Sequence, residues 1–532
     1  MLIDLLNGDR EMSLQAEVCV VGAGAAGVAM ARALNKSGRE VCLLEAGGMD
    51  FESDTQALFE GRNTGMEYYE LDHSRLRFFG GTTNIWGGRC VPLDRMDFER
   101  RDWIPHSGWP ISWEDLDPWY RMAHDSLELG EFDYSAGMWD KLGLKGIDFD
   151  AEEIATTFWR FDEMKERFNR SQCDDLVAAQ KVHIVLHANL THMQADKDAG
   201  HIQSFAARSL QGHRLMVRAK HYVLACGAIE NARLLLNSDD VHSRGLGNAH
   251  DQVGRYFMEH PHGRIAHVES DDPTAFWAMY RKKYPRGGTP VAPALVTSEA
   301  LQRRAGILNG ATTFKAQRPP DKGLPANRKM YMNLKHSLNP SRSGRQIWHV
   351  YRGVRSWLQR NIPMHVIRLG AKAAHMQLYM IGRAEQAPNP LSRVVLSDRQ
   401  DALGCRRADL DWQLSDIDKR SARELALALG REFKRLGLGK VTPSAWLDDG
   451  SRAWPVDATV GNHPIGGYHH MGTTRMSANP VNGVVDANCT VHGVSNLHLA
   501  GSSVFTTGGW ANPTLTILAL TRRLAQHVDS QL

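Results

Sequence analysis

The chain has 532 residues, with 63 Lys and Arg against 60 Asp and Glu, and 42% hydrophobic and 23% charged residues. These values exclude a disordered chain and predict a globular protein of more than one domain. No apolar run reaches about 18 residues, which argues against a transmembrane helix, and the N-terminus lacks the features of a signal peptide. The seven cysteines form no Cys-x-x-Cys pair, so we expect free thiols and a cytoplasmic location.

A short β-strand at 18–21, a glycine-rich turn, a helix and a second strand at 41–44 form the first predicted unit. Gly22 permits the tight turn, Gly24 lets the backbone approach a pyrophosphate, and Gly27 lets helix and strand pack closely. The acid after the second strand can accept a hydrogen bond from a ribose hydroxyl. A dinucleotide site is therefore predicted, without a choice between NAD and FAD. Its residues are Gly22, Gly24, Ala25, Ala26, Gly27, Glu45 and Ala46.

The middle of the chain adds further strand-like segments. A glycine-dense loop at 77–94 predicts neither helix nor strand. Strand-like runs follow at 182–187, 203–207 and 214–218. The strand, small-residue turn and apolar helix at 221–238 are typical of a second nucleotide edge in the same doubly wound sheet, with plain core packing as an equal alternative.

Near the C-terminus the pattern recurs. A strand at 497–500 leads into a turn at Gly501-Ser502, and Asn512-Pro513 then opens a long apolar helix. Asn is a good N-cap and Pro a good first helical residue. The nucleotide-binding domain is thus predicted to be discontinuous, assembled from both ends of the chain and a middle portion.

Five motifs occur in this order: VVGAGAAG…LLEAGG, GGTTNIWGG, ACGAIENARLLLNS, HHMGTTRM and AGSSVFTTGGWANPTLTILAL. Together they resemble the glucose–methanol–choline (GMC) oxidoreductases, FAD-dependent enzymes that oxidise alcohols. The wording of the motifs is closest to the pyranose-oxidase-like and bacterial sugar dehydrogenase branch. The resemblance implies an α/β fold with a Rossmann-like FAD domain and a substrate domain built on a mixed or antiparallel sheet. We expect the FAD domain at 14–105, 165–262 and 455–530, and the substrate domain at 106–164 and 263–454.

The resemblance also implies how FAD would lie. Its adenosine would bind at the first glycine turn and Glu45, its isoalloxazine under the 80–88 loop, and its pyrophosphate or ribityl end at the Gly501-Ser502 turn. The further contact residues implied are Gly80, Gly81, Thr82, Asn84, Trp86, Gly87, Gly88, Ala225, Gly227, Gly501, Ser502, Asn512, Pro513 and Thr514. Pyranose oxidases attach flavin through a histidine in an S-T-H-W loop, where this chain has Ile85. Non-covalent FAD is therefore expected, which favours a dehydrogenase using a quinone or other acceptor over an oxygen-using oxidase.

Two residues match the catalytic positions of the family. His469 corresponds to the base and Asn512 to its polar partner. A neutral imidazole, with an ordinary pKa of about 6.5, suits removal of a hydroxyl proton at neutral pH. Asn512 has an equal alternative as the N-cap of the last helix. We expect His470 to be structural, because adjacent residues in an extended segment face opposite ways, and Arg475 to tie its loop to an acid or phosphate.

Metal binding is not expected. His260-Pro-His262 is a pair of candidate ligands, but no second cluster completes a set of four.

Residues 281–372 form a basic block, with 19 Lys or Arg against two acids. Its arginines alternate with large apolar residues, which predicts an interfacial segment on anionic headgroups, peripheral at the inner membrane face. The alternatives are contact with an acidic partner or an anionic substrate, and a solvated surface; nucleic acid is excluded because no recognition motif is present. The mixed run contains Arg345, Trp348, Arg352, Val354, Arg355, Trp357, Arg360, Ile362, Ile367 and Arg368.

The function expected from these features is oxidation of a primary or secondary alcohol, on a sugar, glycoside or polyol-like unit, to the carbonyl. The electron acceptor would be a quinone, a dye-like acceptor or oxygen. Three alternatives remain: a lipid- or carrier-linked substrate at a membrane, a non-redox lyase with structural flavin, and a flavin-binding protein without turnover.

Overall fold

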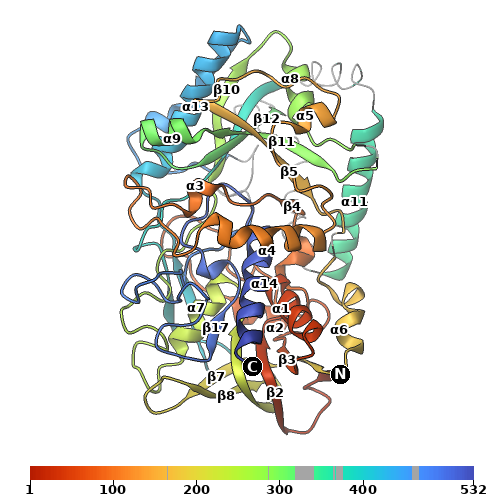
Figure 1. Cartoon of the computed structure of the whole chain (residues 1–532), viewed down its shortest axis with the longest axis vertical. Coiled ribbons are helices and arrows are strands. Elements are labelled where there is room, and N and C mark those ends of the chain that lie inside the picture. The colour runs from red at the N-terminus through yellow and green to blue at the C-terminus, as the bar shows by residue number, and fades with distance from the viewer. Residues whose placement is uncertain are drawn as a thin grey trace.

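The structure, a computed structural model, describes residues 1–164, 166–285, 287–317, 341–362, 366, 369, 376–457 and 467–532. Two large β-sheets organise the molecule, one in each half of its long axis, and both termini lie in the half built on the first sheet (Figure 1). One cluster of buried hydrophobic side chains runs through both halves. The two sheets are therefore packed together as a single body.

The first sheet has the strand order β1-β6-β3-β2-β9-β8-β7, with β17 paired to β9. Its centre is parallel, as in doubly wound folds, and β7 and β8 add an antiparallel edge. The strands are β1 (Leu2–Asp4), β2 (Glu11–Val21), β3 (Val41–Leu44), β6 (Val182–Leu186), β7 (Asn189–Ala195), β8 (Ile202–Arg208), β9 (Arg214–Leu224) and β17 (Leu497–Leu499). Segments from both ends and the middle of the chain thus share one Rossmann-like sheet.

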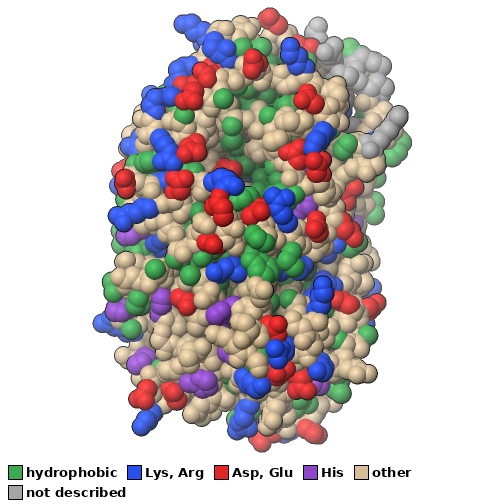
Figure 2. Space-filling model, in the orientation of Figure 1, with side chains coloured by type: hydrophobic (Ala, Val, Ile, Leu, Met, Phe, Trp, Pro, Cys, Tyr) green, Lys and Arg blue, Asp and Glu red, His purple; other side chains and the backbone are tan. Residues whose placement is uncertain are grey.

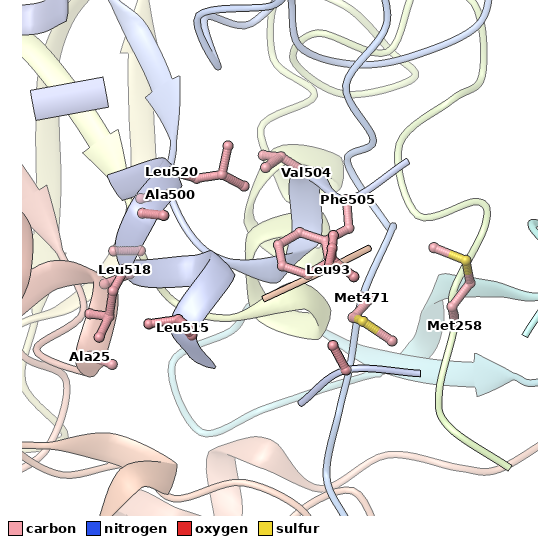
Figure 3. Close-up of a cluster of buried hydrophobic side chains, with 14 of the residues drawn as sticks. Ala25, Leu93, Met258, Met471, Ala500, Val504, Phe505, Leu515, Leu518 and Leu520 are labelled. Atoms are coloured by element: carbon pink, nitrogen blue, oxygen red, sulfur yellow. The ribbon is translucent and has the colours of Figure 1, made fainter. Parts of the chain in front are cut away.

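Helices bring the two ends of the chain together on this sheet. α1 (Ala25–Lys36) packs along α14 (Thr514–Ser530), and α4 (Trp113–Ser126) crosses α14. Figure 3 shows Ala25, at the start of α1, beside Leu515 and Leu518 in the first turns of α14. Because both helices begin at the same place, the N-terminal glycine turn and the C-terminal motif lie next to each other.

The second sheet is antiparallel and has the order β16-β10-β13-β12-β11-β5-β4. α13 (Asp416–Leu436) and α8 (Pro273–Tyr280) pack against it. The strands are β4 (Arg89–Cys90), β5 (Ile154–Phe161), β10 (His262–Glu269), β11 (Val291–Thr297), β12 (Gly310–Gln317), β13 (Gln377–Ala384) and β16 (Lys440–Pro443). The predicted class, a Rossmann-like half joined to an antiparallel half, is confirmed.

Smaller elements complete the fold. β14 (Arg393–Gln400) and β15 (Arg406–Asp411) form a hairpin against α7 (Ala228–Asn237). α11 (Arg342–Asn361) lies along one margin of the molecule and spans both halves (Figure 1). The remaining short helices are α2 (Ser53–Gln56), α3 (Arg95–Phe98), α5 (Met138–Lys141), α6 (Asp174–Ala178) and α9 (Glu299–Ala305), and the 3-10 turns are η1 (Ala57–Phe59), η2 (Gly81–Ile85), η3 (Arg170–Gln172), η5 (Ala445–Asp448) and η6 (Ser502–Val504).

Two local predictions differ from the structure. The glycine-dense loop is not wholly irregular, because it contains the 3-10 turn η2 and ends in β4. The last helix begins at Thr514, and no side chain caps its N-terminus, so Asn512 is not its N-cap. Across the described residues, no helix has the length and apolarity needed to cross a membrane.

Candidate active site

The first glycine turn lies between β2 and α1. Gly22 has a φ of +98°, a conformation that favours glycine. A Cβ on Gly27 would lie 1.8 Å from the Gly22 carbonyl oxygen, so only glycine allows α1 to start this close to the strand. A Cβ on Gly24 would meet no atom within 4 Å. The turn is therefore closed on its protein side and open where a pyrophosphate would approach.

Glu45 follows β3 and is buried beside this turn. Its carboxylate oxygens accept hydrogen bonds from the backbone N–H of Ala23 at 2.8 Å and of Gly47 at 3.0 Å. Burial raises the pKa of Glu45, and these two N–H groups oppose that rise. The carboxylate thus orders the turn and keeps lone pairs for a ribose hydroxyl. Ala46, next in the chain, lines a surface pocket with His187.

The 80–88 loop is seated on the glycine turn. Gly80 donates its N–H to the Ala23 carbonyl oxygen at 2.8 Å, and a Cβ on Gly81 would lie 3.4 Å from the Gly24 Cα. Asn84 is buried and donates to the carbonyl oxygens of Phe79 and Gly81. The loop and the pyrophosphate turn therefore form one continuous wall.

The other predicted residues of this loop serve its anchorage. Thr82 accepts a hydrogen bond from the Leu76 N–H at 3.1 Å. A Cβ on Gly88 would lie 2.2 Å from the Asp162 carbonyl oxygen, and the Trp86 ring lies 6.4 Å from that of Phe168. The contacts of Gly88 and Trp86 anchor the loop on the segment that follows β5.

A second open edge is formed by the turns after β9 and β17. Cβ atoms placed on Gly227 and Gly501 would meet nothing within 4 Å, and both glycines have positive φ. Asn231, which sequence reasoning missed, ties the two turns together by accepting from the Cys226 N–H and donating to Ser503 Oγ. Ala225 follows β9 and donates its N–H to the Val21 carbonyl oxygen. Pro513 and Thr514 lie at the start of α14.

His469 and Asn512 lie side by side. Asn512 Nδ2 lies 3.2 Å from His469 Nε2, and His469 Nδ1 lies 2.8 Å from His260 Nδ1. His260 Nε2 lies 2.8 Å from the Gly509 carbonyl oxygen. A carbonyl oxygen only accepts, so a neutral His260 carries its proton on Nε2 and accepts at Nδ1. His469 must then donate from Nδ1, which leaves the lone pair of its Nε2 as the acceptor for Asn512.

The electrostatic setting keeps His469 neutral. Burial lowers its pKa well below the ordinary value, and His260 and Arg383 lower it further. Burial and nearby Arg383 also lower the pKa of His260, to about 3. Two neutral imidazoles in a fixed orientation therefore present one basic nitrogen. A Cβ on Gly467 would lie 2.8 Å from that nitrogen, so glycine at this position leaves the space beside it open.

Glu259 binds the backbone of both His260 and His469. Its carboxyl group accepts hydrogen bonds from the backbone N–H of His469 at 2.8 Å, from the N–H of His260 at 3.1 Å and from the Tyr68 hydroxyl. Burial raises the pKa of Glu259 to about 8, although these bonds oppose the rise. The segment Glu259-His260 thus positions the candidate base.

His260 and Glu259 were not predicted as site residues. His260 was weighed only as half of a metal pair, and both its ring nitrogens are used by His469 and Gly509. No described residues form a group of three or more His, Cys, Asp or Glu side chains able to hold a metal ion.

His470 packs in the core. Its ring lies 5.9 Å from that of Tyr68 and 5.8 Å from that of Phe257, and its carbonyl oxygen accepts from Ser502 Oγ. Its Nε2 is buried without a hydrogen-bond partner among the described residues and lies 3.9 Å from Glu259 Oε1. These contacts are those of a structural residue.

Arg475 contacts no acid among the described residues. It donates to the His106 carbonyl oxygen at 2.6 Å and lies over the Tyr256 ring, so it ties its loop to a carbonyl and an aromatic face instead of an acid or phosphate.

Comparisons with known proteins agree with this architecture. Family models described as GMC oxidoreductase match residues 160–262 and 388–521, and one described as an NAD(P)-binding Rossmann-like domain matches residues 20–56. The fructose dehydrogenase large subunit of Gluconobacter japonicus is 27% identical over 62% of this chain, and the match covers only 50% of that relative. The 6'''-hydroxyparomomycin C oxidase of Streptomyces lividus is 24% identical over 97% of this chain and 92% of its own length. A solved structure of formate oxidase from Aspergillus oryzae superposes with a TM-score of 0.55 at 16% identity, covering 98% of this chain and 99% of that one.

Proposed function

This chain belongs to the GMC oxidoreductase family, and we propose that it uses FAD to oxidise an alcohol on a sugar, glycoside or polyol-like unit to the carbonyl. The observation that carries the proposal is the fixed tautomer of His469, whose Nε2 lone pair faces Asn512. A neutral base held in one tautomer beside an amide donor is what removal of a hydroxyl proton requires. The relatives named for fructose and for 6'''-hydroxyparomomycin C support a sugar-like substrate.

The chain supplies binding, orientation and proton transfer. FAD, when bound, supplies the two-electron acceptor for the hydride that leaves the alcohol carbon. His469 Nε2 takes the hydroxyl proton, so the CH–OH group becomes C=O with one proton on the imidazole and one hydride transferred. The Asn512 amide holds the same oxygen and cannot titrate at neutral pH. The open positions at Gly24, Gly227 and Gly501 fit a dinucleotide lying across the carboxyl edge of the first sheet.

The FAD is proposed to be non-covalent, because Ile85 occupies the position of the flavin-linking histidine of pyranose oxidases and carries no nucleophilic atom. Acid precipitation of the purified yellow protein tests this. Release of all flavin into the supernatant is expected, and flavin retained in the pellet would contradict it.

Anaerobic reduction of the flavin tests the reaction. Bleaching of the oxidised flavin band by one class of sugar, glycoside or polyol is expected with the wild type. His469→Gln should slow bleaching by about 10²–10⁴-fold, as loss of a general base does, while FAD stays bound. His470→Gln, a change in the adjacent core histidine, is the matched control.

Carbonyl formation without bleaching would indicate lyase chemistry, and FAD binding without any reaction would indicate a structural flavin. Readmitting oxygen and then a quinone identifies the acceptor, for which a quinone is proposed.

A second role is favoured by α11, the helix at the molecular margin (Figure 1). Its protein-facing side contains Arg345, which binds Asp50, and His349, which binds Glu166. The opposite side exposes an apolar stripe at helical spacing, and Figure 2 shows hydrophobic side chains at this margin. The stripe consists of Ile347, Val350, Tyr351, Val354, Trp357 and Leu358, which are 38–67% exposed.

We propose that this stripe rests on an anionic membrane. α11 contains five arginines and no carboxylate, and Arg345 and Arg360 among them pair with acids of the protein. A basic helix with an exposed apolar stripe binds anionic headgroups while its apolar side chains enter the interface. Ile367 and Arg368 of the predicted run, and the side chains of Trp348, Arg352 and Arg355, lie outside the described residues.

Vesicle flotation tests the membrane proposal. Wild-type holoprotein should float with vesicles containing anionic phosphatidylglycerol and not with neutral phosphatidylcholine alone. Val354→Asp with Trp357→Asp should abolish flotation and leave flavin reduction unchanged. A matched pair on another exposed surface, Met122→Asp with Leu144→Asp, should still float. Absence of binding by the wild type would overturn the proposal.

A further inference from the structure

One face of the second sheet carries the side chains nearest the candidate base. Arg383 of β13 is paired directly with His262 of β10. Through Ala311 of β12 and Val296 of β11, the pairing continues to Ala155 of β5, four residues before Trp159 on the same strand. Phe161, two residues after Trp159, is paired with Arg89 of β4. Paired residues and alternate residues of a strand share a face. Consistently, the guanidinium groups of Arg89 and Arg383 lie 5.7 and 5.8 Å from the Trp159 ring.

Arg383 connects this face to the catalytic pair. Its Nη1 donates to Asn512 Oδ1 at 3.3 Å, while Asn512 Nδ2 faces His469 Nε2. Electrostatic effects of both Arg383 and Arg89 reach His469 and His262. The positive charge of Arg383 is thus separated from the basic nitrogen of His469 by the Asn512 side chain alone.

Arg383 is buried without a counter-charge. It is 8% exposed, and among the described residues its one hydrogen bond goes to Asn512 and no carboxylate lies within salt-bridge distance. The acid that acts on it is Glu259, whose carboxyl is largely protonated at neutral pH because its pKa is raised to about 8. By contrast, the equally buried Arg101 binds both oxygens of the Glu385 carboxylate. An uncompensated buried guanidinium is costly, so a ligand anion is the missing partner.

Two further groups on the face lack partners. Trp159 Nε1 and His262 Nδ1 are buried without hydrogen bonds in the described part of the chain. Buried donors of this kind are normally satisfied, and a polyhydroxylated ligand would satisfy them.

We propose that the substrate is an alcohol carrying a carboxylate, of the sugar-acid type, with the carboxylate on Arg383 and the hydroxyl-bearing carbon at His469 Nε2. A guanidinium matches a planar carboxylate with two parallel hydrogen bonds, and Arg89 adds positive potential. The carboxylate takes no part in the redox step. The position of the hydroxyl-bearing carbon at His469 rests on the proposed alcohol oxidation. The position of the carboxylate on Arg383 does not depend on it.

Paired substrates test it in the FAD-loaded enzyme. Anaerobic flavin reduction is measured with methyl glucoside against methyl glucuronide, and with sorbitol against gluconate. The quantity compared is the flavin reduction rate divided by the dissociation constant. In at least one pair, this ratio should be at least tenfold higher for the acid than for the neutral member. Arg383→Gln should remove that advantage, so that the acid member loses at least ten times more than the neutral member, while Arg303→Gln, at an exposed position on α9, should change neither. A preference for the neutral members, or an equal loss of both in Arg383→Gln, would overturn the proposal.

Binding without turnover separates this proposal from the proposed function. The flavin absorbance of the holoenzyme is titrated with acetate and with inorganic phosphate. Acetate binding that weakens at least tenfold in Arg383→Gln and is retained in Arg383→Lys supports the carboxylate site even where no alcohol bleaches the flavin. Acetate affinity equal in wild type and Arg383→Gln, or saturation by phosphate alone, contradicts it. The wild-type substrate pairs remain decisive where Arg383→Gln does not fold.

Discussion

The Nδ1 atoms of His260 and His469 lie 2.8 Å apart, and this contact determines which nitrogen of His469 is basic. The carbonyl oxygen of Gly509 fixes the His260 proton on Nε2, His260 Nδ1 then accepts from His469, and the lone pair of His469 Nε2 remains available. His260 is therefore a positioning residue that acts through His469.

Replacement of His260 should impair the base without removing it. His260→Leu deletes the acceptor for His469 Nδ1, so we expect flavin reduction to slow by about 10–100-fold, as loss of a supporting hydrogen bond does. His260 also lowers the pKa of His469, so the acid limb of the pH profile should move to higher pH. His260→Gln, whose side-chain carbonyl can accept the same bond, should recover part of the rate. A His260→Leu enzyme with the wild-type rate and pH profile would contradict this role.

The pH dependence of the wild type follows from the same charges. A base with a lowered pKa stays neutral well below pH 6.5, so reduction by a neutral alcohol should remain constant from neutral pH into the mildly acidic range. Burial raises the pKa of Glu259 to about 8, so its carboxyl becomes negatively charged above that pH. Burial lowers the pKa of Arg383, but a guanidinium keeps its proton in proteins, so Arg383 stays positively charged.

Carboxylated alcohols should therefore lose affinity as the pH rises through about 8, because Glu259 gains a negative charge close to Arg383. Dissociation constants from anaerobic titrations between pH 6 and about 10 measure this. The alkaline limb should be steeper for gluconate than for sorbitol. Identical limbs for the two would indicate that Glu259 does not act on the carboxylate.

Much of the nucleotide edge could be predicted from the sequence, because it depends on local spacing. Gly22, Gly24 and Gly27 belong to one turn, and their spacing in the sequence is enough to predict that turn. The pairing of His469 with Asn512 was available only through resemblance to a family. Arg383 and Asn231 carry no local signal: strand register puts Arg383 opposite His262, and long-range packing brings Asn231 to Ser503.

Local sequence also misassigned the end of the last motif. Asn before Pro reads as an N-cap, but tertiary contacts with His469 and Arg383 take its amide, and the helix starts at Thr514 without a side-chain cap. A residue that fits both a local and a long-range role cannot be assigned from neighbours in the chain alone.

Two glycines of the first turn should respond differently to alanine. A Cβ on Gly27 would lie 1.8 Å from the Gly22 carbonyl oxygen, so Gly27→Ala must shift α1 and should destabilise the protein without FAD by about 3 kcal/mol or more. Gly24→Ala meets no atom within 4 Å and should leave that stability within about 0.5 kcal/mol. Its methyl group would occupy the pyrophosphate space, so FAD affinity should fall at least tenfold. Urea unfolding of the apoprotein measures the loss of stability, and flavin titration measures the loss of FAD affinity. Equal destabilisation of the apoprotein by Gly27→Ala and Gly24→Ala would contradict the prediction.

A buried ion cluster holds α7 to the segment that precedes the 80–88 loop. Glu230 lies within 3.3 Å of the guanidinium groups of Arg75 and Arg77 and 2.7 Å from that of Arg233, which also binds Asp401. Burial alone would raise the pKa of Glu230, but the three arginines outweigh it and lower the pKa to about 2. Because the folded-state pKa is below the unfolded value of about 4.3, the contribution is present at neutral pH and is lost as the pH falls from about 4 through 2.

Glu230→Gln should therefore lower the free energy of unfolding by about 3–5 kcal/mol at pH 7, since it leaves three buried guanidinium groups with Asp401 as their carboxylate. Urea unfolding at pH 7 measures the loss, and the difference from wild type should shrink as the pH approaches the pKa of Glu230. Glu11→Gln, in an exposed pair with Arg214, is the matched control and should change stability by no more than about 0.5 kcal/mol. Equal effects of the two substitutions would mean that the cluster adds no stability beyond a surface pair. The loop that carries Arg77 continues into Gly80 on the glycine turn, so Glu230→Gln should also weaken FAD retention, which Glu11→Gln should not.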